Sequence, residues 1–374
     1  MTLCFVSDYY PTLPVFGGIA LYTQRIARAL AQRGHQVHIV VAKAGEGKNF
    51  DDEGVHVHFC ATRWLPGIGR WLPGLGESLG IARVLARLHR EHHFDLVEIP
   101  NWEGIGFAPV WIPGLKVVIR LHTSLAESIE TAGRPPTPPE RFMIWMERTS
   151  TRRAHAVVTH SIAHRDRMAA AYGLSPDPIV VIPHGVPMPA QVSPPEGTVV
   201  LSIGRMTARK GMDTLFAAIP SILERVPGAR FQIVGVTPDH EAMRALTQRC
   251  PGAVEALGVV DSVRLSELYN RCAIYVSPAT YESFGLTFAE AMAHGRPVVG
   301  CAVSAVPEIV RTGIDGLLVP PRDADALAGA IVELLRDEGL LRRMGAAARQ
   351  RAMEHYSLDT AVARCEEFFA RVQS

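Results

Sequence analysis

Short apolar runs rich in β-branched residues alternate with longer segments of helical period along the whole chain, and this rhythm restricts the fold. Such alternation is typical of a parallel sheet whose two faces are covered by helices. The rhythm stops in the proline-rich stretch HGVPMPAQVSPPEG (184–197) and restarts at TVVLSIGR (198–205). The sequence therefore predicts two doubly wound α/β domains, residues 1–184 and 185–356.

Composition excludes several classes of protein. With 374 residues at 48% hydrophobic, the chain can build two cores. Lys+Arg 38 against Asp+Glu 37 gives a net charge of +1, so no global field attracts nucleic acid and an anion site must be built locally. The six scattered cysteines favour a reducing compartment, and we expect a cytoplasmic protein. The chain shows neither a transmembrane run nor the features of a signal peptide, so membrane contact would be peripheral.

Two segments that follow predicted strands could hold an anion. Gly17 and Gly18 precede an amphipathic helix, and a backbone without Cβ can approach a phosphate at a helix start. A glycine pair that only supplies unusual loop dihedrals is an equal alternative. Arg205 and Lys210 flank the entrance to a helix in the second domain, and a solvated charged loop is the alternative there. Lysine is scarce in this chain, which indicates a chosen point charge at position 210.

The stretch YESFGLTFAE (281–290) places Glu282 before a turn and Glu290 inside the following helix. The backbone N–H groups at the helix start suit a diphosphate, whereas the two carboxylates would repel one and should bind hydroxyl groups instead. The ligand implied is a nucleoside diphosphate sugar. The alternative is a turn residue and a helical acid that the helix dipole stabilises. The residues offering the backbone donors are Phe284, Gly285, Leu286 and Thr287.

These motifs resemble those of the retaining glycosyltransferases of the GT-B fold, the large Glu-x7-Glu family called group 1. The resemblance extends over essentially the whole chain and is most specific in the second half. It implies two Rossmann-like domains facing a central cleft, an N-terminal acceptor domain and a C-terminal donor domain, with the helix at 357–374 crossing back onto the first. The segments that carry it are FGGIALYTQRIARALAQRGHQVHIV, RLHTS, VIPHGV, SIGRMTARKGMDTL and the run from LGVVDSV to TGIDGLLV.

The resemblance also implies a role for each motif residue of the second domain. Arg205 and Lys210 would neutralise the diphosphate. Glu290 would bind the ribose hydroxyls, and Glu282 the hydroxyls of the transferred sugar near the reacting carbon. The backbone from Phe284 to Thr287 would donate to the phosphates.

Further positions follow from the same resemblance. Gly17 and Gly18 would close the phosphate side from the first domain, and His122 of RLHTS would line the donor sugar site. Without the family, a histidine at a strand end is more often structural. Val259 and Val260 fall where the family contacts the nucleotide base through backbone groups, but apolar packing explains such a pair equally well, and the base stays open.

The implied reaction moves a sugar from a nucleoside diphosphate sugar to a hydroxyl of a sugar, lipid-linked or small-molecule acceptor, with retention of configuration. We expect no metal or other cofactor, because DDE (51–53) is typical of a polar loop and DAD (323–325) of a helix cap. A nucleotide-sugar epimerase would need an acid/base pair that is not identifiable. A non-catalytic nucleotide-sugar binding protein would not need the sugar contacts of Glu282.

Two segments of the first domain are candidates for acceptor recognition. A tandem RWLPG repeat at 63–80 carries Trp64 and Trp71, and 131–148 is rich in proline, arginine and aromatic residues. Such loops could cover an acceptor or contact the inner face of a membrane, and simple packing over the sheet edge is an equal alternative.

Overall fold

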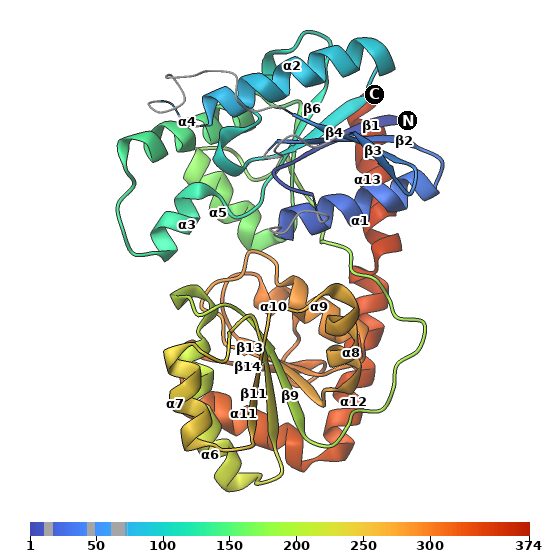
Figure 1. The fold of residues 1–374 in the computed structure, drawn as a ribbon. Coiled ribbons are helices and arrows are strands. Elements are labelled where there is room, and N and C mark those ends of the chain that lie inside the picture. Colours follow the sequence, from blue (N-terminus) through green and yellow to red (C-terminus); the bar gives the residue numbers. More distant parts are fainter. Residues whose placement is uncertain (11–17, 43–48, 61–71, 73) are drawn as a thin grey trace. The chain divides into compact units, whose positions relative to one another are not determined.

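The chain forms two compact units, each a mainly parallel sheet covered by helices on both faces, and this confirms the predicted architecture (Figure 1). The first unit contains Met1–Gly185 and Leu358–Ser374, and the second Val186–Ser357. No helix within the described part of the chain is long and apolar enough to cross a membrane. The computed structural model describes residues 1–10, 18–42, 49–60, 72 and 74–374.

Among the described residues of the first unit, eight strands form one sheet, parallel except for the β3–β4 pair. In spatial order they are β3 (Phe50–Asp52), β4 (Val55–Phe59), β2 (Gln36–Val41), β1 (Thr2–Ser7), β5 (Leu96–Pro100), β6 (Val117–Arg120), β7 (Ala156–Thr159) and β8 (Ile179–Val181). The helices are α1 (Gly18–Gln32), α2 (Leu75–His92), α3 (Leu125–Thr131), α4 (Pro138–Arg153), α5 (Ile162–Tyr172) and α13 (Leu358–Gln373), with short 3₁₀ turns η2 (Trp102–Gly104) and η3 (Pro109–Trp111).

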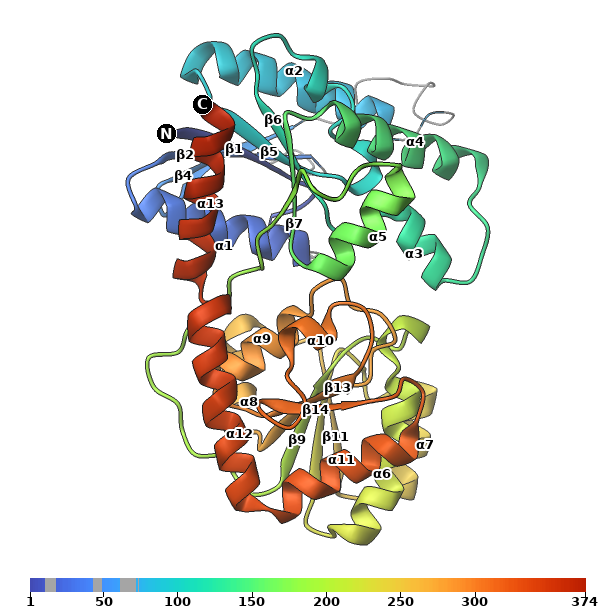
Figure 2. The same cartoon turned by 180° about the vertical axis from the view of Figure 1, so that it is seen from behind.

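Strand alternation assigns the side chains of this sheet to two cores. In β1, Leu3 and Phe5 join the core under α1 and α13, whereas Cys4 and Val6 join the core under α2 and α5. Both faces are buried, which explains why the central strands read as continuous apolar runs. The C-terminal helix α13 lies beside α1, and its Phe369 ring makes an edge-on contact with Phe5 at a centroid distance of 6.2 Å (Figure 2).

The second unit contains a six-stranded parallel sheet. Its strands in spatial order are β11 (Val254–Gly258), β10 (Arg230–Val234), β9 (Val199–Ile203), β12 (Ile274–Ser277), β13 (Val298–Cys301) and β14 (Gly316–Val319). The helices are α6 (Met212–Arg225), α7 (Glu241–Arg249), α8 (Ser262–Arg271), α9 (Leu286–Ala293), α10 (Val306–Ile309), α11 (Ala324–Arg336) and α12 (Glu338–Arg351), with a 3₁₀ turn η4 (Ala208–Lys210) and a π-helical turn η5 (Ala352–Tyr356).

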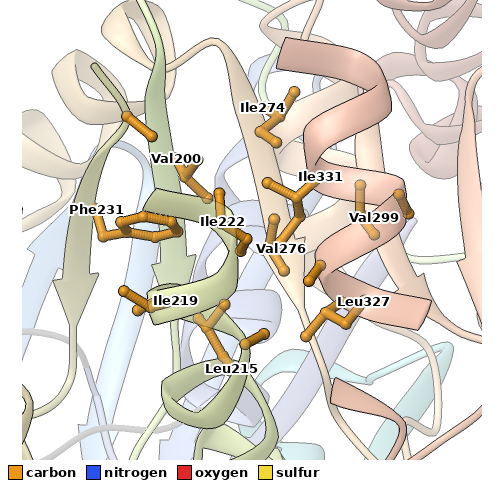
Figure 3. Packing of buried hydrophobic residues seen from close by; sticks show 14 of the residues in the cluster. Val200, Leu215, Ile219, Ile222, Phe231, Ile274, Val276, Val299, Leu327 and Ile331 are labelled. Carbon is orange, nitrogen blue, oxygen red and sulfur yellow. The ribbon is translucent and has the colours of Figure 1, made fainter. Parts of the chain in front are cut away.

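One face of this second sheet packs against α6 and α11 (Figure 3). Ile219 of α6 lies on the side of Phe231 of β10, and Ile331 of α11 lies beside Val276 of β12; all four side chains are fully buried. Branched aliphatic side chains on both layers fill the space without polar atoms, so the burial of apolar area stabilises the layer contact. The carboxyl ends of the strands are thereby held in a fixed arrangement, and the loops that follow them carry the site residues.

Candidate functional site

The segments that follow β9 and β12 are joined by a backbone hydrogen bond and a close backbone contact. The two strands are parallel neighbours, so their carboxyl ends lie at the same edge of the sheet. The backbone N–H of Thr280 donates to the carbonyl oxygen of Arg209 at 2.9 Å. Gly211 has φ of +59°, and a Cβ there would lie 2.1 Å from the carbonyl oxygen of Pro278, so only glycine allows this approach. The contact fixes the positions of the side chains on both loops.

Lys210 and Glu282 meet at this edge as an ion pair. The Nζ atom of Lys210 lies 2.5 Å from Oε1 of Glu282, whose side chain is 9% exposed. A guanidinium nitrogen of Arg209 lies 3.7 Å from the other carboxylate oxygen. Arg205, on the same segment after β9, is exposed. The structure therefore joins two of the predicted residues, and it adds Arg209, which the sequence analysis did not single out.

The helix α9 begins a few residues after Glu282 in the chain. Gly285 is its N-cap with φ of +100°, so Leu286 and Thr287 contribute the first N–H groups of the helix, which have no acceptor within the helix itself. The Phe284 side chain is buried and makes an edge-on contact with Tyr356, so only its backbone remains for a ligand. The segment that carries Glu282 therefore leads directly into the N-terminus of α9.

Glu290 lies in the second turn of α9 and is largely buried. The hydroxyl of Tyr269, on α8, donates to its Oε2 atom at 3.2 Å. Burial raises the pKa of Tyr269 well above its ordinary value, so the phenol stays protonated and keeps donating. The contact holds the Glu290 carboxylate in one orientation.

The structure describes only some of the residues predicted to contact the nucleotide base and to close the phosphate side. Val259, after β11, is 93% exposed, whereas Val260 is partly buried and packs against the core cluster that contains Phe288. Packing therefore accounts for Val260 but not for Val259. Gly18 is the exposed first residue of α1, while Gly17 lies outside the described residues. Most of the RWLPG tandem, including both of its tryptophans, also lies outside them.

The two acidic segments considered as metal ligands, DDE (51–53) and DAD (323–325), form hydrogen bonds within the fold. Asp52 accepts from Nε of Arg28 at 2.9 Å and from the amide of Gln24 at 3.2 Å. Asp323 caps α11 by accepting from the backbone N–H of Ala326 at 2.9 Å. Asp323 caps a helix as predicted, whereas Asp51 and Asp52 lie in strand β3 and not in the predicted polar loop, because this segment pairs with β4.

His122 lies in the first unit, just after β6, and its backbone N–H donates to Oδ1 of Asn101 at 2.8 Å. Its ring is buried beside three other rings, those of Tyr22, His160 and His184. Burial lowers the pKa of His122 well below its ordinary value, and the nearby Arg120 guanidinium lowers it further. Burial also lowers the pKa of the other two histidines, so all three imidazoles are neutral at pH 7.

The three histidines bring one nitrogen each to within 4.8 Å of one another, which raises the question of a metal ion. A tetrahedral site needs nitrogens roughly 3.4 Å apart, each with its lone pair aimed at the ion. The His184 ring is nearly parallel to the other two, at 13° to His122 and 28° to His160. Lone pairs in stacked, nearly parallel planes do not converge on one point, so an ion would require the rings to turn.

His160 and His184 were missed by the sequence analysis, although a signal was present. RLH, VTH and VIPH each place a histidine one to three residues after a strand, and these strands, β6, β7 and β8, are consecutive parallel neighbours. Because their carboxyl ends share one edge of the sheet, the pattern alone could have predicted a histidine cluster.

Comparison with known proteins supports the same assignment of fold and family. The family model described as Glycosyltransferase Family 4 matches residues 16–188, and the one described as Glycosyl transferases group 1 matches residues 197–337. The D-inositol 3-phosphate glycosyltransferase of Actinosynnema mirum is 27% identical over 87% of this chain and 85% of its own length.

A GDP-mannose-dependent alpha-(1-6)-phosphatidylinositol monomannoside mannosyltransferase of Mycobacterium tuberculosis is 34% identical over 46% of this chain and 47% of its own. The sucrose-phosphate synthase of Thermosynechococcus elongatus has the same fold, with a TM-score of 0.82 at 21% identity over 99% of this chain and 98% of that one. The two family models together match both units, and the chain belongs to the group 1 glycosyl transferases of GT-B fold.

Proposed function

We propose that the protein transfers a sugar from a nucleoside diphosphate sugar to a hydroxyl acceptor with retention of anomeric configuration. The second unit would bind the donor and the first the acceptor. The observation that carries the proposal is the Lys210–Glu282 ion pair, which precedes α9 in the fold. The same helix carries Glu290, whose carboxylate accepts a hydrogen bond from Tyr269. The ion pair and this helix combine a cation and N–H donors for phosphate with carboxylates for sugar hydroxyls.

The chemistry needs positive charge where the diphosphate departs and room for an oxocarbenium-like sugar. Lys210, Arg205 and the first N–H groups of α9 would stabilise the negative charge that grows on the leaving group. Glu282 is already neutralised by Lys210 at 2.5 Å, which makes it a weak nucleophile and suits it to binding hydroxyls. Attack on the same face as the departing diphosphate, with a phosphate oxygen taking the acceptor proton, is then the route we favour.

The names of the relatives suggest the class of substrate. One is named for GDP-mannose and a phosphatidylinositol mannoside, and another for D-inositol 3-phosphate. We propose a sugar, a lipid-linked glycan or a small polyol as acceptor. Membership of the transferase family favours transfer over the epimerase and the non-catalytic binding protein.

The test of this function is an NMR time course with a panel of nucleoside diphosphate sugars and hydroxyl acceptors. The first product formed should keep the anomeric configuration of the donor. Release of nucleoside diphosphate with an inverted product would contradict retention. An epimerised donor formed without any acceptor would favour the epimerase instead.

We also propose that transfer needs no divalent metal, because Lys210, Arg205 and the start of α9 would together stabilise the charge of the bound diphosphate. The initial rate is expected to be unchanged after exhaustive chelation, and also when magnesium or manganese is added back. Activity that disappears with the chelator and returns with the metal would contradict this proposal.

We propose a cytoplasmic location, with peripheral membrane contact through exposed aromatic residues of the first unit. Trp111 and Trp145 are 53% and 50% exposed, Trp145 stacks on Phe142 and makes a tilted contact with Phe107, and the Arg153 guanidinium lies 3.5 Å over the Trp111 ring. Aromatic rings with adjacent cations suit an anionic membrane interface. Trp145→Ala should reduce co-sedimentation with anionic vesicles, and equal sedimentation of variant and wild type would contradict the contact.

A further inference from the structure

Glu147 lies in the middle of α4 with no exposed surface, and its carboxyl group accepts three hydrogen bonds. Its Oε1 atom accepts from the backbone N–H of Glu103 at 2.9 Å and from that of Leu125 at 3.2 Å. Its Oε2 atom accepts from the hydroxyl of Tyr172 at 2.9 Å. Burial raises the pKa of Glu147 to about 8, and these donors offset only part of that effect. The roles expected of the motif residues do not explain why a carboxyl group is buried here with three specific hydrogen-bond donors.

The two backbone donors belong to loops that carry the carboxyl ends of neighbouring strands. Glu103 follows β5 and Leu125 follows β6, and these strands pair in parallel. Glu103 has φ of +52°, a conformation that L-residues adopt at a cost, and the bond to Glu147 helps to retain it. At Gly104 a Cβ would lie 2.5 Å from Cβ of Met146, so this loop is packed directly onto α4.

A second path leads from Glu147 to His122. The amide of Asn101 donates to the Tyr172 hydroxyl at 3.2 Å, and that hydroxyl donates to Glu147. The carbonyl oxygen of the same amide accepts from the backbone N–H of His122 at 2.8 Å. Leu125, which Glu147 binds directly, is only three residues after His122. The histidine is therefore held by two tethers that both begin at one buried carboxyl group.

We infer that Glu147 is a positioning residue, which sets the place of His122 through Tyr172, Asn101 and the start of α3. The inference rests on the proposed function and on the expectation, from the family resemblance, that His122 lines the donor sugar site. Glu147 itself touches no substrate. Misplacement of a substrate-contacting group by about 1 Å can cost on the order of 10²-fold in rate, so loss of both tethers should be seen in turnover.

The kinetic test compares Glu147→Ala with Glu147→Gln, Tyr172→Phe and His122→Ala. Glu147→Ala should lower kcat by about 10-fold or more, as we also expect of His122→Ala, and leave the Kd for nucleoside diphosphate unchanged, because the nucleotide would be held by the second unit. Glu147→Gln keeps a carbonyl oxygen for both backbone N–H groups and should restore most of kcat. Tyr172→Phe removes only the path through Asn101 and should give an intermediate loss.

Leu85→Ala is the matched control. Leu85 is fully buried on α2, in the same core as Tyr172, and it forms none of the hydrogen bonds of either tether, so its truncation should lower thermal stability and leave those bonds in place. Assayed well below its melting temperature, it should keep the wild-type kcat. A kcat for Glu147→Ala equal to that of wild type, or a loss matched by Leu85→Ala, would overturn the inference.

Amide hydrogen exchange separates this inference from the proposed function. Glu147→Ala should speed exchange at the amides of Glu103, His122 and Leu125 by at least 10-fold, whereas Leu85→Ala should not single them out. If wild type transfers no sugar from any donor, the proposed function fails and exchange alone decides whether Glu147 holds the loop. Exchange at these three amides that matches the Leu85→Ala pattern would contradict the inference.

Discussion

Replacing Lys210 by alanine is expected to lower turnover by about 10²-fold or more, the range seen when a donor to a developing negative charge is removed. The ammonium group would strengthen its contact with the diphosphate as the bond to the sugar breaks, so the loss should be in kcat. The variant should remain folded, because the Lys210 side chain is partly exposed and ends the short 3₁₀ turn η4, outside the hydrophobic core. Arg205→Ala is expected to behave similarly, and the double variant should be worse.

Arg264→Ala is the matched control for the cation variants. Arg264 is an exposed cation of the same unit that pairs with Glu267 on α8 at 2.8 Å, and its loss should leave turnover unchanged. Melting temperatures of all variants exclude unfolding as the cause. Wild-type turnover in Lys210→Ala would remove the assignment of this lysine to the leaving group.

The second large effect is expected for nucleotide binding. Glu290→Ala should weaken the affinity for the free nucleoside diphosphate by roughly 10- to 150-fold, because a charge-assisted hydrogen bond to the ribose contributes about 1.5–3 kcal/mol. Glu282→Ala should spare the nucleotide and weaken only the sugar donor, since its proposed partners are the sugar hydroxyls. Titration calorimetry with the diphosphate and with the matching sugar donor measures both.

Tyr269→Phe provides the control for this division of roles. It removes the hydroxyl that orients Glu290 but keeps the ring and the carboxylate, so its effect on nucleotide affinity should be smaller than that of Glu290→Ala. If Glu290→Ala and wild type bind the diphosphate equally, Glu290 does not hold the ribose.

The fold could be predicted because the alternation of apolar strands and amphipathic helices is visible in short segments and repeats along the chain. Buried parallel strands must read as apolar runs, and the Pro-rich segment from residue 184 marks where one sheet ends and the next begins. Strand order in the sheet is less local, but the family resemblance assigned Lys210 and Glu282, on two separate motifs, to one donor site, and this implied that β9 and β12 end close together.

Much of the site surroundings could not be predicted, since it depends on packing between distant elements. Glu147 reads as an ordinary helical acid in WMERTS, and only the packing of α4 against the loops after β5 and β6 makes it a buried acceptor. The Tyr269 contact with Glu290 joins two helices and leaves no spacing pattern either. His160 and His184, in contrast, had a readable pattern at the strand ends.

The most direct test of the central claim is calorimetric titration of wild type, Lys210→Ala and Glu290→Ala with UDP, GDP and ADP and then with their sugars. The account predicts that at least one nucleoside diphosphate binds wild type, that its sugar form binds too, and that Glu290→Ala loses affinity for both. Ligands that bind only the native state also raise its melting temperature, which gives an independent reading. Absence of binding by every diphosphate to the folded wild type, or equal binding by all three proteins, would contradict the account.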